Sequence, residues 1–133
     1  MSFSISQASV PALTIALNAL SGILDKAAAF STAKKIDPSV LLNTRLAPDM
    51  FPLTRQIQIA ADLAKNGGGR LAGLEPPRYE DTETTIEQLK ERLAKTVAYL
   101  KALDTKQIDA SGDREITFPM GPTELLPVRL TPT

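Results

Sequence analysis

The sequence has no cysteine, histidine or tryptophan among its 133 residues. Without cysteine and histidine the chain has no disulfide, no thiolate nucleophile, no imidazole base and none of the metal sites that need those ligands. Net charge is absent too, because 15 lysines and arginines balance 15 acidic residues. This balance argues against a protein that binds nucleic acid through a basic surface. We therefore predict no catalytic residue, no bound metal and no cofactor.

Charged side chains are also missing from the first 24 residues. A signal peptide carries a basic segment before its apolar core, but the first basic residue is Lys26. Apolar residues recur three and four positions apart, at Val10, Leu13, Leu17, Leu20, Leu24 and Ala27, beside a polar stripe of Thr14, Asn18, Ser21 and Asp25. That pattern is typical of an amphipathic helix with one buried face, not of a membrane span. We expect a cytoplasmic protein with no membrane segment.

The residues that are present, 43% hydrophobic and 23% charged, suit one globular domain. The first helix is predicted to begin between residues 6 and 9, with Pro11 in its first turn, and to end before Asp37. Asp37 caps a short predicted helix over residues 38–43. A second long helix begins near Pro52. We expect it to continue through the glycines at 67–69 to Leu71, although each glycine costs roughly 1 kcal/mol relative to alanine.

The third long helix has the clearest start, because Thr84 and Glu87 have the spacing of a capping box. Its apolar stripe contains Ile86, Leu89, Leu93, Val97, Leu100 and Leu103. Residues 114–118 then alternate like a short strand. The prolines that follow predict an irregular tail. We therefore divide the chain into a helical bundle domain over residues 1–118 and a proline-rich extended tail over residues 119–133.

These elements predict an all-α fold, an antiparallel up-down bundle of three long helices. Three helices leave part of their apolar surface uncovered, and monomers rarely expose so large a patch. We expect a homodimer in which two copies pack these stripes together across a two-fold axis. The stripes are Leu13, Leu17, Leu20 and Leu24 on the first helix, and Leu89, Leu93, Val97 and Leu100 on the third.

The candidate binding residues are Arg55, Gln58 and Asp62, which share one face of the second helix because they lie at i, i+3 and i+7. One interpretation is the polar lining of a pocket. The other is a solvated face with a local pair between Arg55 and Asp62. A carboxylate site for Mg²⁺ or Ca²⁺, formed by Asp49 with Glu115 or Asp113, would need oxygen ligands of this kind, but their spacing favours ordinary loop surface.

Several segments resemble one bacterial family. The most specific are the connector at 45–53 (RLAPDMFPL) with the helix start at 55–62 (RQIQIAAD), and the linker at 71–77 (LAGLEPP). Residues 6–11 (SQASVP) and 95–100 (KTVAYL) complete the match. The chain resembles, over residues 1 to about 124, an uncharacterised domain-of-unknown-function group of the DinB-like (YfiT-like) metalloenzyme superfamily.

The resemblance implies a four-helix bundle with up-down-down-up connectivity, usually dimeric, and in several superfamily members a divalent metal held by three histidines for thiol-dependent transfer or hydrolysis. This chain has no histidine onto which such a ligand can be carried. Where the family runs into a fourth, aromatic-rich helix, residues 125–133 read LLPVRLTPT. We expect a protein of non-catalytic, interaction or structural role. The alternatives are a small metal-dependent transferase or hydrolase, and a regulatory module whose apolar groove accepts the helix of a protein partner.

Overall fold

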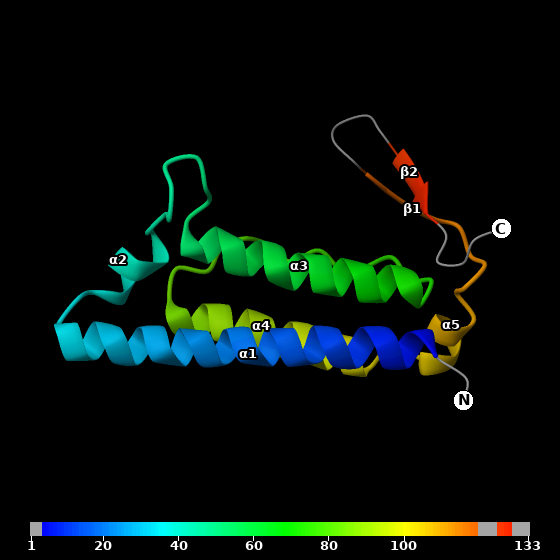
Figure 1. Ribbon diagram of the computed structural model, residues 1–133, viewed down its shortest axis with the longest axis horizontal. Coiled ribbons are helices and arrows are strands. Elements are labelled where there is room, and N and C mark those ends of the chain that lie inside the picture. Colours follow the sequence, from blue (N-terminus) through cyan, green and yellow to red (C-terminus); the bar gives the residue numbers. More distant parts are fainter. Residues whose placement is uncertain (1–3, 120–124, 129–133) are drawn as a thin grey trace.

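The computed structural model describes residues 4–119 and 125–128. Three long helices lie side by side and make up most of the molecule (Figure 1). The helices are α1 (Ile5–Lys34), α2 (Pro38–Leu42), α3 (Leu53–Leu71), α4 (Ile86–Lys101) and α5 (Thr105–Asp109), and two short strands follow, β1 (Ile116–Pro119) and β2 (Leu125–Val128). The prediction of an all-α bundle is confirmed.

The direction of the three long helices follows from the linker over residues 72–85. α1 runs antiparallel to α3, as predicted, but the linker then returns along the bundle, so that α4 runs in the same direction as α3 (Figure 1). This is the up-down-down part of the connectivity that the resemblance implied. Both α1 and α3 pack on α4, and the core forms where their leucines and alanines meet.

Helix α1 begins one residue before the predicted range. The hydroxyl of Ser4 accepts a hydrogen bond from the backbone N–H of Gln7, which satisfies one of the free donors of the first turn. Pro11 therefore lies in the second turn, not the first, and has no N–H to give to the helix. α2 begins as predicted, with Asp37 as its cap and Pro38 at its first position.

Helix α3 continues through the three glycines to Leu71, as predicted. Close packing explains two of them. A β-carbon at position 68 would overlap with Cδ2 of Leu100 on α4, and one at position 69 would lie 2.6 Å from the hydroxyl of Tyr99. The two glycines let the ends of α3 and α4 approach each other.

The capping box of α4 lies one residue later than predicted, at Thr85 and Gln88, so the assignment to Thr84 and Glu87 was wrong. The side-chain oxygen of Gln88 accepts from the backbone N–H of both Thr84 and Thr85. This register makes Ile86 the first helical residue, and Ile86 is buried. Burial of that side chain decides between two caps that look alike in the sequence.

The segment after α4 is more regular than predicted. A short helix, α5, is capped by Asp104 and was not expected. The strand predicted over residues 114–118 overlaps β1, which begins two residues later, at Ile116. β1 pairs antiparallel with β2, so residues 125–128 are not irregular. Each strand of a two-stranded ribbon has one free edge, which is where a strand tolerates proline. The rest of the predicted tail, residues 120–124 and 129–133, lies outside the described residues.

The stripes predicted to join two copies are instead largely buried within one chain. Leu17 and Leu24 of α1 and Leu89, Leu93 and Leu100 of α4 are all at most 3% exposed. They meet each other in the core, because α1 packs directly on α4. A substitution there, such as one at Leu93, therefore tests folding rather than association.

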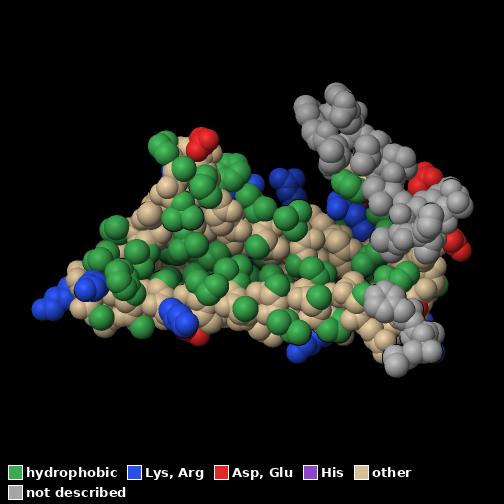
Figure 2. Space-filling view, viewed as in Figure 1, with side chains coloured by type: hydrophobic (Ala, Val, Ile, Leu, Met, Phe, Trp, Pro, Cys, Tyr) green, Lys and Arg blue, Asp and Glu red, His purple; other side chains and the backbone are tan. Residues whose placement is uncertain are grey.

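A second apolar face is left open on the side away from α4. In Figure 2 a continuous band of hydrophobic side chains follows the furrow between α1 and α3. The furrow contains a hollow of about 370 Å³, where Ile23 and Leu63 are more than half exposed. A second hollow of about 480 Å³ lies at its α2 end, lined mainly by α2, the connector that follows it and the start of α3. Only 11% of the most apolar 18-residue stretch of α1 is buried. By length and composition alone this helix could cross a membrane, a test that buried core helices and signal sequences near an N-terminus also pass.

Candidate functional site

A buried arginine on α4 holds the returning linker in place. The side chain of Arg92 is only 2% exposed. Its Nη1 donates to the carbonyl of Glu80 at 3.0 Å and to the carboxylate of Glu83 at 2.9 Å, and it lies 3.0 Å from Oδ1 of Asp81. Its Nη2 donates to Asp62 on α3 at 2.8 Å. Arg92 therefore ties the linker to α3 and α4 at once.

The three predicted binding residues share one face of α3, as expected, and all three belong to this cluster. Arg55 pairs with Asp81 at 2.7 Å, Gln58 donates to Glu83 at 3.0 Å, and Asp62 holds both Arg92 and Lys65. The partner of Arg55 is thus an acid of the linker and not Asp62. The cluster joins side chains from α3, the linker and α4. Neither predicted interpretation, a polar pocket lining or a solvated face with a local pair between Arg55 and Asp62, describes it fully.

An aromatic ring is clamped beside the cluster. The ammonium groups of Lys65 and Lys95 lie 4.3 and 4.1 Å from the ring centre of Tyr79, within the range of a cation–π contact. Lys65 is itself buried and also pairs with Asp62 at 3.2 Å. Burial raises the pKa of the Tyr79 hydroxyl. The linker is therefore fixed by its aromatic side chain as well as by its acids.

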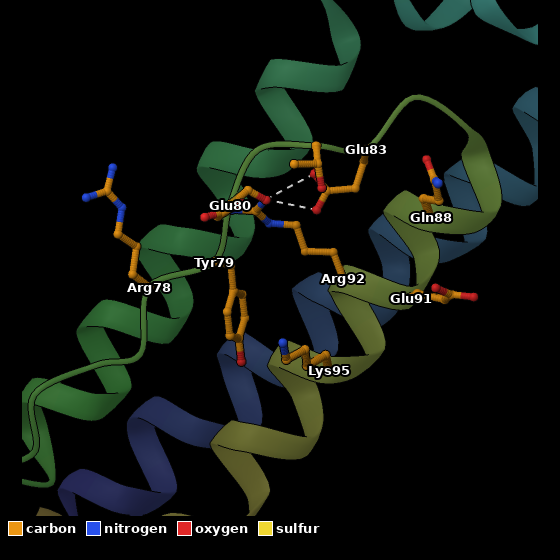
Figure 3. A pocket seen from close by; sticks show the side chains of 9 residues that line it. Arg78, Tyr79, Glu80, Glu83, Gln88, Glu91, Arg92 and Lys95 are labelled. Carbon is orange, nitrogen blue, oxygen red and sulfur yellow. Dashed lines mark hydrogen bonds and ion pairs between the residues drawn. The ribbon is translucent and has the colours of Figure 1, made fainter.

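Two cavities flank the linker. One, of about 420 Å³, lies between the linker and α4 and is shown in Figure 3, where Tyr79 and Lys95 lie side by side and Arg92 reaches the backbone of Glu80. The other, of about 720 Å³, lies between the linker and α3. Among the predicted binding residues, Asp62 lines this second cavity, whereas Arg55 and Gln58 line neither. The first is lined by three basic side chains (Arg78, Arg92, Lys95) and three acidic ones (Glu80, Glu83, Glu91). Such a balanced lining favours neither anions nor cations.

Competing effects set the pKa of Glu83, one of the acids bonded to Arg92. Burial alone would raise the pKa of Glu83, but hydrogen bonds from Arg92, from its own backbone and from Gln58 outweigh burial and hold that pKa below its ordinary value of 4.5. A carboxylate that accepts several hydrogen bonds is stabilised in its charged form. Glu83 is thus a charged structural partner of Arg92 and not a proton donor at neutral pH.

The lowered pKa of Glu83 predicts an acid-sensitive fold. A group whose pKa is lower in the folded chain stabilises the fold fully above its ordinary value, and this stabilisation is lost as the pH falls through the lowered one. We expect the free energy of unfolding to fall below about pH 4.5, and Glu83→Gln to remove part of that fall. Urea unfolding at a series of pH values measures both. An equal effect of Glu91→Gln, which removes an exposed acid from α4, would show that bonding to Arg92 is not the cause.

The known proteins that this chain resembles agree with the fold. The family model for a domain of unknown function, DUF1993, matches residues 5–129. The chain belongs to the DUF1993 family. The crystal structure of a DinB family member protein from Shewanella denitrificans is 40% identical in sequence, with a TM-score of 0.81 over 86% of this chain. This DUF1993 chain spans 65% of the length of that solved protein. Among curated proteins none matches it.

The metal that the DinB-like resemblance implies does not fit the residues of this DUF1993 chain. The sequence has no histidine, and the acids nearest to one another, Asp62, Asp81 and Glu83, surround the guanidinium of Arg92, where a cation already lies. Over residues 4–119 and 125–128 no three acids are placed to hold an ion. Asp49 lies at the α2 end of the bundle, whereas Asp113 and Glu115 lie beyond α5 at the other end (Figure 1), so the carboxylate site is not formed.

Arg92, the centre of the cluster, was not among the predicted site residues, although the sequence contains a signal for it. Arg92 lies three positions after Leu89 and four before Thr96, so it falls on the buried face of α4. A charged residue on an apolar face is rarely buried unless it is paired. That rule points to a buried ion pair at Arg92, but nothing in the sequence identifies Glu83 and Asp81 as its partners.

Proposed function

We propose that this DUF1993 protein is non-catalytic and acts by binding another protein surface. The observation that carries the proposal is the open furrow between α1 and α3, a continuous apolar band in contact with water. Large uncovered apolar patches are typical of surfaces that bind protein partners. The interaction or structural role expected from the sequence is consistent with such a surface.

The charged cluster supports the same proposal. An active site usually holds acids and bases whose charges are used on a substrate. Here the acids around Arg92 are paired with basic side chains, and their effect is to fix the linker. The side chains that could supply a thiolate or an imidazole are absent from the sequence. The cluster therefore stabilises the position of the linker, and we assign the binding of another protein to the apolar furrow.

Metal binding separates this proposal from its alternative, a metal-dependent transferase or hydrolase. Carboxylates without histidine or cysteine hold zinc and nickel weakly, because these ions prefer nitrogen and sulfur ligands. We expect untagged protein, dialysed against Zn²⁺, Ni²⁺ or Mn²⁺ and then washed, to retain far less than one ion per chain by elemental analysis. One tightly held ion per chain, with thiol-dependent activity that appears only when it is bound, would contradict the non-catalytic role.

A further inference from the structure

We propose that the hollow at the α2 end of the bundle binds an uncharged small molecule that is mostly hydrocarbon and carries a hydroxyl group. The hollow has a volume of about 480 Å³ and is bordered by α1, by α2, by the connector that joins α2 to α3, and by the start of α3. We call it the connector hollow. The inference goes beyond the proposed function, because the ligand is a small molecule and not a protein.

The connector that forms one wall of this hollow is held in shape by its own hydrogen bonds. Nη1 of Arg45 donates to the carbonyl of Met50 at 2.8 Å, and the backbone N–H of Met50 donates to the carbonyl of Ala47 at 3.0 Å. At the base of the connector, the backbone N–H of Leu53 donates to the carbonyl of Thr44 at 3.1 Å. The connector projects from the bundle between α2 and α3 (Figure 1). A wall that is already fixed loses little conformational entropy when a ligand binds, which favours affinity.

Three apolar side chains of the connector line the hollow although they are open to water. Leu46 is 89% exposed, Phe51 is 56% exposed and Met50 is 38% exposed. A fixed loop that keeps such side chains in water forgoes the free energy of burying them, which a bound hydrocarbon would restore. Ligand pockets of about 300–1,000 Å³ typically have apolar walls and a few polar groups that orient the ligand. The connector hollow therefore has the size and the lining of a small-molecule site.

The polar groups of the lining indicate the chemistry of the ligand. Among the residues that the structure describes, no charged side chain lines the hollow, and its polar side chains are Thr44 and Gln56. The hydroxyl of Thr44 donates to the carbonyl of Val40 at 2.6 Å, which leaves its oxygen able to accept. The amide nitrogen of Gln56 donates to the carbonyl of Phe51 at 3.4 Å, so its amide oxygen is an acceptor as well. Acceptors in an uncharged lining favour a neutral ligand with a hydroxyl donor, because a charge there would lack a partner.

Displacement of the neutral fluorophore N-phenylnaphthylamine by ligands with the same hydrocarbon chain tests the proposal. We expect decanol to displace the fluorophore, and decanoate and decylamine to bind at least about fivefold more weakly, since their charges find no partner in the hollow. The methyl ether of decanol has no hydroxyl donor, so it should bind at least about threefold more weakly than decanol.

Two substitutions of Met50 place opposite charges in the same wall. The hydrogen bonds of Met50 are made by its backbone, so Met50→Glu and Met50→Lys should keep the wild-type circular dichroism spectrum. We expect each to weaken decanol by at least about fivefold. Met50→Glu should prefer decylamine to decanoate and Met50→Lys should prefer decanoate to decylamine, because opposite charges attract. The matched control is Leu74→Glu, an exposed leucine outside the hollow, which should leave all these affinities unchanged.

A chain that binds none of these ligands would overturn the proposal, and so would binding that both Met50 variants leave unchanged. Equal affinity for decanol and its methyl ether would overturn the assignment of a hydroxyl group. Loss of decanol binding in Leu63→Glu but not in Met50→Glu would overturn the location, since Leu63 lines the furrow and not the connector hollow. Binding to vesicles of phosphatidylcholine and phosphatidylglycerol without binding to decanol would assign the connector to a membrane surface instead.

Discussion

Replacing Arg92 by methionine is expected to destabilise the fold by about 3 kcal/mol, because removal of one partner leaves buried charge uncompensated. The side chain of Arg92 is 2% exposed and that of Glu83 only 12%. We place the effect at the lower end of the usual range because Asp81 and Asp62 keep Arg55 and Lys65 as partners. Urea unfolding at neutral pH measures it.

The pH dependence of Arg92→Met distinguishes lost charge compensation from lost packing. Without Arg92, its hydrogen bond and its charge no longer oppose the effect of burial, so the pKa of Glu83 is higher in the variant than in the wild type. As the pH falls, Glu83 is therefore protonated at a higher pH in the folded variant than in the folded wild type. The difference in unfolding free energy between the wild type and the variant should then shrink between neutral pH and about pH 4. A deficit that stays constant would mean that packing alone was lost. Arg78→Met, which removes an exposed arginine from the same cavity, should change stability by less than about 0.5 kcal/mol.

The helices themselves could be predicted because their signals are local. Caps, prolines and apolar periodicity act within a few residues of each other, so α1, α2, α3 and α4 were found with boundaries close to those observed. The errors came where a distant contact decides. Thr84 and Thr85 are equally good caps on their own, and only the burial of Ile86 selects Thr85. The pairing of β1 with β2 is likewise a contact between segments that prolines seemed to exclude.

The apolar pattern of α1 shows why the open furrow could not be predicted. The sequence places Leu13, Leu17, Leu20 and Leu24 in one stripe, and that stripe predicts one buried face. In the structure the stripe divides. Leu17 and Leu24 are buried in the core, whereas Leu13 and Leu20 are only partly buried and line the hollow between α1 and α3, which Leu17 also borders. A periodicity of three and four describes a broad apolar surface, but it does not say how many neighbours share it.

The binding candidates show the same limit. Arg55, Gln58 and Asp62 were correctly placed on one face, since helix geometry is local. What that face meets depends on the return path of the linker over residues 72–85, which no local rule describes. The acidic residues before α4, Asp81 and Glu83, are the partners of Arg55, Gln58 and Arg92. Their role follows from the topology and not from their position in the sequence.

Two neighbouring glycines of α3 are expected to respond to alanine with opposite signs. A β-carbon at position 67 meets nothing within 4 Å, so Gly67→Ala should stabilise the fold by up to about 1 kcal/mol through helix propensity. A β-carbon at position 68 would overlap with Cδ2 of Leu100 and lie 3.1 Å from Cδ1 of Leu103, both buried leucines. Overpacking costs about 1–3 kcal/mol, which exceeds the gain in propensity, so Gly68→Ala should destabilise the fold.

A double-mutant cycle identifies the contact responsible at position 68. Valine at position 100 lacks the terminal carbon that the new β-carbon would meet, so Leu100→Val should cost less in the Gly68→Ala background than in the wild type. We expect a favourable coupling of about 1 kcal/mol, typical of residues in direct contact, measured by urea unfolding of the four proteins. Additive effects would show that Leu100 moves aside freely. Stabilisation by Gly68→Ala itself would show that α3 and α4 are not held together as closely as the two glycines at positions 68 and 69 allow.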